Sequence, residues 1–275
     1  MPSLSRAAGS SWPPETPSSS PSSAAPRSRC RCCRSCARGP TSPTRRSLIA
    51  CASHLHRPDQ LEPVRSLLAK AGATEDDLEC GPEPTRLEHN CSGKHAAMLL
   101  LCRERGWPTD GYRLASHPCQ QEALAQVAQA ADVEPASIPT AIDGCGIVTY
   151  ALTLERMAYA FSRLETLDGG RRAADAMRAR PELVRGDGAP DTELMRLGYG
   201  WVAKGGAEGL VCAARDGLGI ALRVEDGAQR PLGVALAAFL AQLGLDAGNL
   251  ATVRVANSRG EIVGELRVHG LAPAR

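Results

Sequence analysis

The most informative stretch of the sequence is His89-Asn90-Cys91-Ser92-Gly93-Lys94-His95. It is polar, and it stands just before apolar side chains that recur at helical spacing and predict a helix over 93–105. Gly106 follows as a stop signal. Cys91 and Lys94 are three residues apart, about one helical turn, so both side chains can face the same point. The sequence therefore predicts a group of reactive or ligand-binding side chains where a helix begins.

This spacing has three interpretations. Cys91 could be a nucleophile, because a thiolate there is stabilised by the positive helix end and by the ammonium group of Lys94. The same two side chains could bind a metal ion together with ligands from elsewhere in the chain. In the third interpretation, Asn90 or Ser92 simply caps the helix. The spacing alone leaves all three open.

Three further polar islands interrupt the apolar pattern. They are Ser53-His54, Asp143-Gly144-Cys145-Gly146 and the glycine-rich turn 204–209 that begins with Lys204. Glycine lets a substrate approach the backbone closely, and N–H groups in such turns can stabilise an oxyanion.

The residues of these islands also have plainer interpretations. Ser53 is the best-placed hydroxyl, although a serine is more often a cap than a nucleophile. Lys204 follows an apolar strand, so it is either a surface lysine or a partly desolvated lysine with a lowered pKa that could deprotonate a serine. Cys145 could be a buried structural cysteine.

From Leu48 onward the chain has the pattern of an α/β protein, in the broad sense that includes α+β. The predicted helices are 58–72, 93–105, 118–131, 153–165, 170–180 and 231–243. The predicted strands are 140–143, 201–203, 210–214, 220–224, 252–255 and 262–268, the last two forming a hairpin. Residues 47–275 are expected to form one domain.

Residues 1–46 differ in composition from the rest. They are rich in Ser, Pro and Arg, show no apolar period, and contain eight Arg but only one acidic residue. We expect this segment to be disordered, to be a transit peptide, or to be a wrong-frame translation of a GC-rich gene. Its cluster Cys30, Cys32, Cys33 and Cys36 lacks the spacing of a standard zinc site.

Composition excludes several classes of protein. No run of eighteen apolar residues and no signal-like N-terminus is present, so the expected location is the cytoplasm. The eleven cysteines are irregularly spaced and odd in number, which favours free thiols. The chain without its basic start is net acidic, which argues against a nucleic-acid-binding core. Phosphate-binding loop, dinucleotide and His-Glu-x-x-His motifs are also missing.

The four islands together resemble the rhizobial-type L-asparaginases, which differ from the threonine-dependent asparaginases. The segments 51–54, 90–96, 142–146 and 204–209 occur in that family's order, over about residues 47–268. The resemblance implies a fold like that of serine β-lactamases and glutaminases, with a mixed sheet packed with helices. It also implies a homodimer.

The resemblance further implies a reaction and a set of site residues. Family members hydrolyse L-asparagine to aspartate and ammonia through Ser–Lys pairs beside a zinc ion. Carried over by motif, Ser53 and Lys204 are the catalytic pair. Substrate contacts fall on Asp143, His54 and Asn90. The zinc ligands fall on Cys91, Lys94 and Cys145, which requires Lys94 to be neutral.

The chain departs from the family pattern in three places. The family's first Ser–Lys pair lies in an Arg-Ser-x-x-Lys-Pro segment, but here Arg27-Ser28 is followed by Arg31, and arginine cannot act as a base. The stretch between about Pro82 and Thr85 is shorter than in the family. His89 replaces a polar amide before Asn90.

Three functional hypotheses follow from the sequence. The first is an asparagine amidohydrolase, or a descendant of one that has lost activity. The second is a non-catalytic zinc-binding homologue that keeps Cys91, Lys94 and Cys145. The third is a thiol-dependent amidase that uses Cys91 or Cys145.

Overall fold

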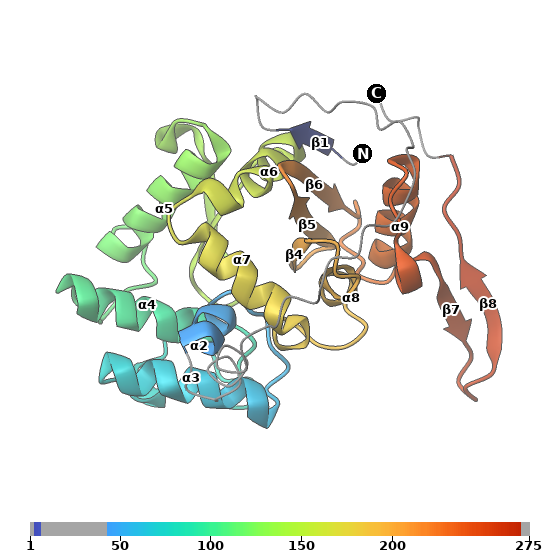
Figure 1. Cartoon of the computed structure of the whole chain (residues 1–275). Helices are drawn as coiled ribbons and strands as arrows, with labels where there is room; N and C mark the ends of the chain where they lie inside the picture. Colours follow the sequence, from blue (N-terminus) through green and yellow to red (C-terminus); the bar gives the residue numbers. More distant parts are fainter. Residues whose placement is uncertain (1–2, 7–42, 271–275) are drawn as a thin grey trace, which may run out of the picture.

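The computed structural model describes residues 3–6 and 43–270 (Figure 1). Its helices are α2 (Pro43–Ala50), α3 (Pro58–Ala71), α4 (Ser92–Arg105), α5 (Pro118–Ala131), α6 (Leu154–Ser162), α7 (Gly170–Ala179), α8 (Pro190–Arg196) and α9 (Leu232–Gln242). Its strands are β1 (Ser3–Arg6), β2 (Thr140–Ile142), β3 (Val148–Tyr150), β4 (Val202–Gly205), β5 (Leu210–Arg215), β6 (Leu218–Arg223), β7 (Val253–Ala256) and β8 (Ile262–Leu266).

The main sheet has the strand order β1-β6-β5-β4, and each of its described pairings is antiparallel. A mixed sheet was expected. The difference arises because β4, β5 and β6 follow one another through short turns, which join antiparallel neighbours. The broader expectation of an α/β protein with a sheet packed with helices is confirmed.

Helices cover both faces of this sheet. On one face, Cys212 and Ala221 pack against α6, and a methyl group on Gly219 would lie 1.8 Å from the carbonyl oxygen of Ala158. On the other face, Val211 and Ile220 belong to a core that also takes side chains from α7, α8 and α9. We call this second cluster the sheet core. The four central residues of β5 and of β6 are all buried, which is typical of strands covered on both faces.

A second core lies among the helices α2 to α5, on the left of Figure 1, and we call it the helical core. Val64 and Leu68 of α3 pack in it with Leu99 of α4. Helix α2 belongs to both cores, because Leu48 is buried in the sheet core and Ile49 in the helical core. The residues that follow α2 therefore lie where the two cores meet.

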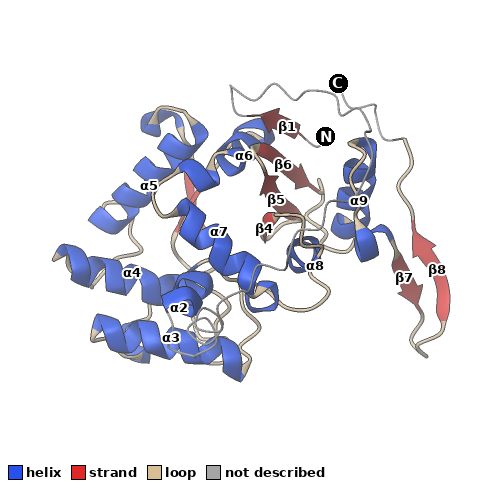
Figure 2. Ribbon diagram, in the orientation of Figure 1, coloured by secondary structure: helices blue, strands red, loops and turns tan. Residues whose placement is uncertain are grey.

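The structure agrees with most of the predicted elements. Helices α3, α4 and α5 lie within one residue of their predicted bounds, and the hairpin β7–β8 lies at the edge of the molecule beyond α9 (Figure 2). Helix α8 and strand β3 were not predicted. Strand β1 and the first half of α2 lie in the segment 1–46, for which no regular structure was predicted; residues 7–42 fall outside the described residues.

Two predictions from composition can be compared with the described residues. The seven cysteines within them are free thiols, as expected. Within the same residues, the helices are too short or too polar to cross a membrane.

Candidate active site

Ser53 and Lys204 meet where the two cores join. The chain leaves α2 through Cys51 and Ala52, and the backbone N–H of Ser53 donates to the carbonyl oxygen of Val184 at 2.8 Å. Lys204 lies on β4, and its Nζ donates to Ser53 Oγ at 2.9 Å. The two residues are 151 positions apart in the chain, and both are half-buried. The predicted pair is thus brought into direct contact.

The environment of Lys204 favours its neutral form. Burial lowers the pKa of Lys204 below its ordinary value, and the positive charge of Arg185 acts in the same direction. The negative charge of Asp191 opposes this but does not outweigh it. A neutral lysine in contact with a serine hydroxyl can accept its proton and so create a nucleophilic alkoxide.

Asp191 fixes the strand that carries this lysine. Its carboxylate is fully buried, and Oδ2 accepts a hydrogen bond from the N–H of Gly205 at 2.6 Å, while Oδ1 accepts from the N–H of Thr192 at 3.0 Å. Asp191 is the second residue of the short helix α8. This helix was not predicted from the sequence, so no role was predicted for Asp191. Its only sequence signal is Pro190, a residue common in the first turn of a helix.

Cys91, Lys94, Asp143 and Cys145 form a second group, which we call the cysteine–lysine cluster. Lys94 Nζ lies 3.3 Å from Asp143 Oδ2, and Cys145 Sγ donates to Asp143 Oδ1 at 3.0 Å. The thiols of Cys91 and Cys145 lie close enough to shift each other's pKa. The start of α4 and the turn between β2 and β3 thereby place predicted residues from two islands together.

The two thiols of the cluster have different pKa values. The hydrogen bond from Cys145, together with the charge of Lys94, lowers the pKa of Cys91 to about 7, and the same hydrogen bond followed by burial raises the pKa of Cys145. Burial alone would lower the pKa of Lys94, but Cys91, Cys145 and Asp143 outweigh it and leave that pKa raised. The pKa is therefore lowered at Lys204 but raised at Lys94.

The donor set of this cluster suits zinc. Two thiols and an amine lie within mutual reach, and thiolates are preferred ligands of soft or borderline metal ions. Among residues 3–6 and 43–270, no three His, Cys, Asp or Glu side chains are arranged as a metal site. Zinc at this cluster would therefore need Lys94 as its third ligand, with the lysine deprotonated on binding.

The structure places the side chain of His54 inside the protein and that of Asn90 at the surface. The ring of His54 is buried, and its Nδ1 accepts from the N–H of His56 at 3.2 Å. Its Nε2 lies 2.9 Å from Ser92 Oγ, which itself donates to the carbonyl oxygen of Leu87. Both ring nitrogens are thus used inside the protein. The side chain of Asn90 is exposed, and its carbonyl oxygen accepts from the N–H of His54.

The helix-capping interpretation of this stretch is wrong. Cys91 occupies the cap position of α4, and its side chain forms no capping hydrogen bond. Ser92 uses its hydroxyl on Leu87 and His54 instead. The polar residues before α4 therefore serve the cluster and the support of Ser53.

The model of the L-asparaginase II family matches residues 22–268. The chain belongs to the L-asparaginase II family. No curated protein matches the sequence.

Family membership confirms the resemblance that the four islands indicated. Each island lies inside the range that the L-asparaginase II model matches, as do Arg27, Ser28 and Arg31. Arg27, Ser28 and Arg31 lie outside the residues that the structure describes. Membership of this family supports an amidohydrolase of asparaginase type.

Proposed function

We propose that this chain hydrolyses the side-chain amide of L-asparagine, giving L-aspartate and ammonia, through Ser53 and Lys204. The observation that carries the proposal is the 2.9 Å contact between Lys204 Nζ and Ser53 Oγ, made by a lysine whose pKa is lowered. Family membership supplies the substrate class.

The reaction proceeds in two stages. Neutral Lys204 takes the proton of the Ser53 hydroxyl, and the alkoxide attacks the amide carbon. The C–N bond then breaks, ammonia leaves with a proton returned by the lysine, and the aspartyl group remains on Ser53 as an ester. In the second stage Lys204 takes a proton from water, the hydroxide attacks the ester carbon, and Ser53 leaves with its proton restored.

The cysteine–lysine cluster would serve the substrate and a zinc ion. Burial raises the pKa of Asp143, but the hydrogen bond from Cys145 and the charge of Lys94 leave it lowered, so this carboxylate is ionised at neutral pH. It is suited to bind the α-ammonium group of asparagine. Cys91, Lys94 and Cys145 would hold the zinc ion, which when bound supplies a positive charge beside the reaction.

An ammonia-release assay tests the proposal. Purified protein is given L-asparagine or L-glutamine, with and without zinc. Ser53→Ala and Lys204→Met should each lower the turnover of asparagine about 1,000-fold or more, because nucleophile and base act as a unit. Lys70→Met, which removes an exposed lysine paired with Glu104, is the matched control and should leave the rate unchanged. Equal activity in Ser53→Ala and the native chain would overturn the assignment.

The start of the chain carries a proposal of its own. Since no lysine precedes Lys70, the first Ser–Lys pair of the family is missing, and we propose that residues 1–46 do not represent the family's native N-terminus. Translation of the same DNA in its other two frames tests this. Absence of an Arg-Ser-x-x-Lys-Pro segment in both frames would remove the idea.

A thiol-dependent amidase is the second candidate. Cys91 is half-buried at the beginning of α4 and lies beside the ammonium group of Lys94, a setting that stabilises thiolates. Cys91→Ser separates the candidates. A cysteine nucleophile would lose nearly all turnover, whereas a zinc ligand would chiefly lose metal affinity. A zinc-binding homologue without activity would release no ammonia under any condition.

The assembly and location of the chain follow from the family resemblance alone. We propose a cytoplasmic homodimer. Light scattering after size-exclusion chromatography should give about twice the 29.0 kDa mass of one chain. A mass equal to one chain at micromolar concentration would contradict the dimer.

A further inference from the structure

Arg185 lies near Lys204, whose pKa its charge helps to lower, and the mechanism above gives it no contact with the substrate. The N–H of Ser53 donates to the carbonyl oxygen of Val184, so Arg185 directly follows the residue that pairs with the serine. On the lysine side, a methyl group on Gly205 would lie 2.5 Å from Arg185 Nη1. The first observation places the backbone of Arg185 near Ser53, and the second places its guanidinium beside Gly205, the residue after Lys204.

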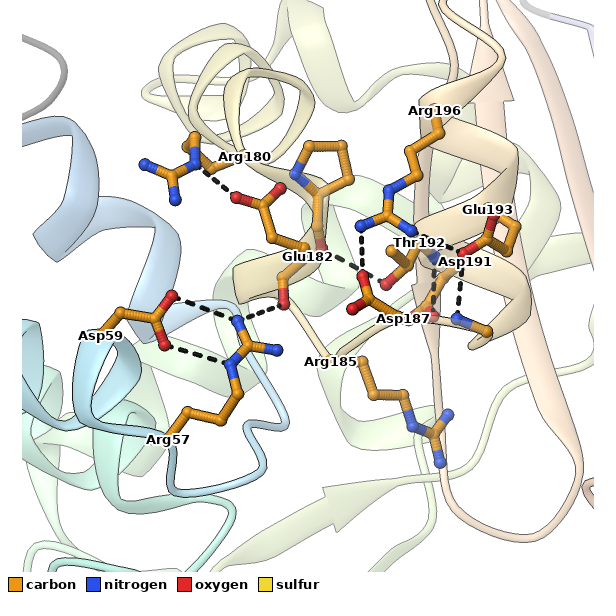
Figure 3. Close-up of polar contacts among 12 residues, drawn as sticks. Arg57, Asp59, Arg180, Glu182, Arg185, Asp187, Asp191, Thr192, Glu193 and Arg196 are labelled. Carbon is orange, nitrogen blue, oxygen red and sulfur yellow. Dashed lines mark hydrogen bonds and ion pairs between the residues drawn. The ribbon is translucent and has the colours of Figure 1, made fainter.

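The arginines around this position are engaged in ion pairs. Arg57 binds Asp59 and the carbonyl oxygen of Glu182, and Arg180 binds the carboxylate of Glu182. Arg196 binds both Asp187 and Glu193. Figure 3 shows these pairs as two separate groups on either side of Arg185 in the sequence, and together we call them the belt.

Arg185 differs from them. Within residues 3–6 and 43–270 its guanidinium forms no hydrogen bond and no ion pair, and Figure 3 shows its side chain extending away from the belt. The nearest anion, Asp191, already accepts hydrogen bonds from the backbone at both oxygens. A guanidinium has five N–H donors, and a half-buried one without acceptors in the protein is available to an external anion.

A solute can reach this arginine. Arg185 lines an open hollow of about 760 Å³, together with Pro190 of α8 and with Gln229, Arg230 and Asn249. This volume falls in the range of small-molecule sites. The wall of the hollow also carries Arg230 and the carboxylates of Asp187 and Glu193, which are both paired with Arg196.

We propose that Arg185 binds the α-carboxylate of the substrate and restricts the site to amides that carry a free carboxylate. The inference rests on the proposed function, whose substrate it specifies. The planar guanidinium matches a carboxylate with two parallel N–H donors. With Asp143 facing the ammonium group, the site presents opposite charges to the two ends of a zwitterionic amino acid. Asparagine within a peptide lacks the free carboxylate and is excluded.

Substrates with and without the carboxylate test the proposal. β-Alaninamide is asparagine without its α-carboxylate. At a pH at which Lys204 is neutral in both proteins, Arg185→Met should lower kcat/KM for L-asparagine by about 10- to 100-fold, mainly through KM, and should change the value for β-alaninamide by less than about twofold. Arg185→Lys keeps the positive charge but loses the two parallel N–H donors, so its kcat/KM for L-asparagine should lie between those of the native chain and Arg185→Met. Arg196→Met removes a paired arginine of the same segment and is the matched control, with both values unchanged.

A merely structural role gives a different result. If Arg185 only offsets the buried charge of Asp191, the Met variant will lose activity equally on both substrates, and the proposal is overturned. Thermal unfolding of each variant shows whether the fold is kept; if Arg185→Met does not fold, Arg185→Lys decides the question by the same comparison.

Binding without turnover separates this inference from the proposed function. Calorimetry with L-aspartate needs no catalysis, and the native chain should bind it at least about 10-fold more tightly than Arg185→Met does. If the native chain binds aspartate in this way but releases no ammonia from asparagine, the proposed function fails and the role of Arg185 stands. Equal binding by both proteins, or none by either, overturns the role of Arg185.

Discussion

Lys204 must be neutral before it can take a proton from Ser53, and this requirement makes turnover depend on pH. Below its pKa the lysine is an ammonium ion and cannot act as a base, so kcat/KM should rise with pH as the proton leaves. Because burial lowers this pKa, the rise should be complete below the ordinary lysine value of about 10.4. Lys204→Arg should be inactive throughout, because arginine stays charged. A pH–rate profile checks both expectations, and a rate that falls across this range would contradict them.

His54 links acidity to the stability of the fold. Burial, helped by His56 and His89, lowers its pKa from 6.5 to about 4, so between these values the unfolded chain binds a proton that the folded chain does not. The free energy of unfolding should therefore fall as pH decreases through this window, by about 3 kcal/mol in total from this residue. Urea denaturation of the native chain and of His54→Gln at pH 7 and pH 4 measures the difference. A His54→Gln variant with the full native pH dependence would assign the loss to other groups.

At the scale of elements, the contact between α2 and α4 sets the position of the cluster. A methyl group on Gly93 would lie 2.3 Å from the carbonyl oxygen of Ile49, so α4 can begin where it does only because this residue has no side chain. Gly93→Ala should lower the free energy of unfolding by about 1–3 kcal/mol. Gly81→Ala is the matched control, since nothing lies within 4 Å of a methyl group there. Chemical denaturation measures both, and equal stability of the two variants would show that α4 can shift freely.

The elements also show what the sequence can predict. Helix α4 ends at Arg105, with the predicted stop signal Gly106 as its cap, because apolar repeats and glycine signals are local. Helix α8 was missed since its seven residues are too few to show an apolar period. Periodicity could not relate Ser53 to Lys204, and only the family resemblance paired them. The roles of Asp191 and Arg185 depend on contacts across the chain, which no local pattern encodes.

At the scale of the whole molecule, zinc should stabilise the fold. The cysteine–lysine cluster joins α4 to the β2–β3 turn, so a metal ion bound there would link two segments that are far apart in the sequence. An ion that binds only the folded state raises stability by mass action, by about 2.7 kcal/mol at 100 times its dissociation constant. Zinc should raise the melting temperature of the native chain, and a chelator should reverse the effect. Cys91→Ser should show neither change; an undiminished zinc shift in this variant would place the metal elsewhere.

The position of α2 has a consequence for how the protein would lose activity. Ser53 follows the helix that is shared by both cores, and Lys204 belongs to the sheet alone. A slight parting of the two cores would separate base from nucleophile while each core kept its own packing. The rate of catalysis should therefore depend on the contact between the sheet core and the helical core. In mild urea we expect inactivation to precede the loss of circular dichroism, as a local opening precedes global unfolding.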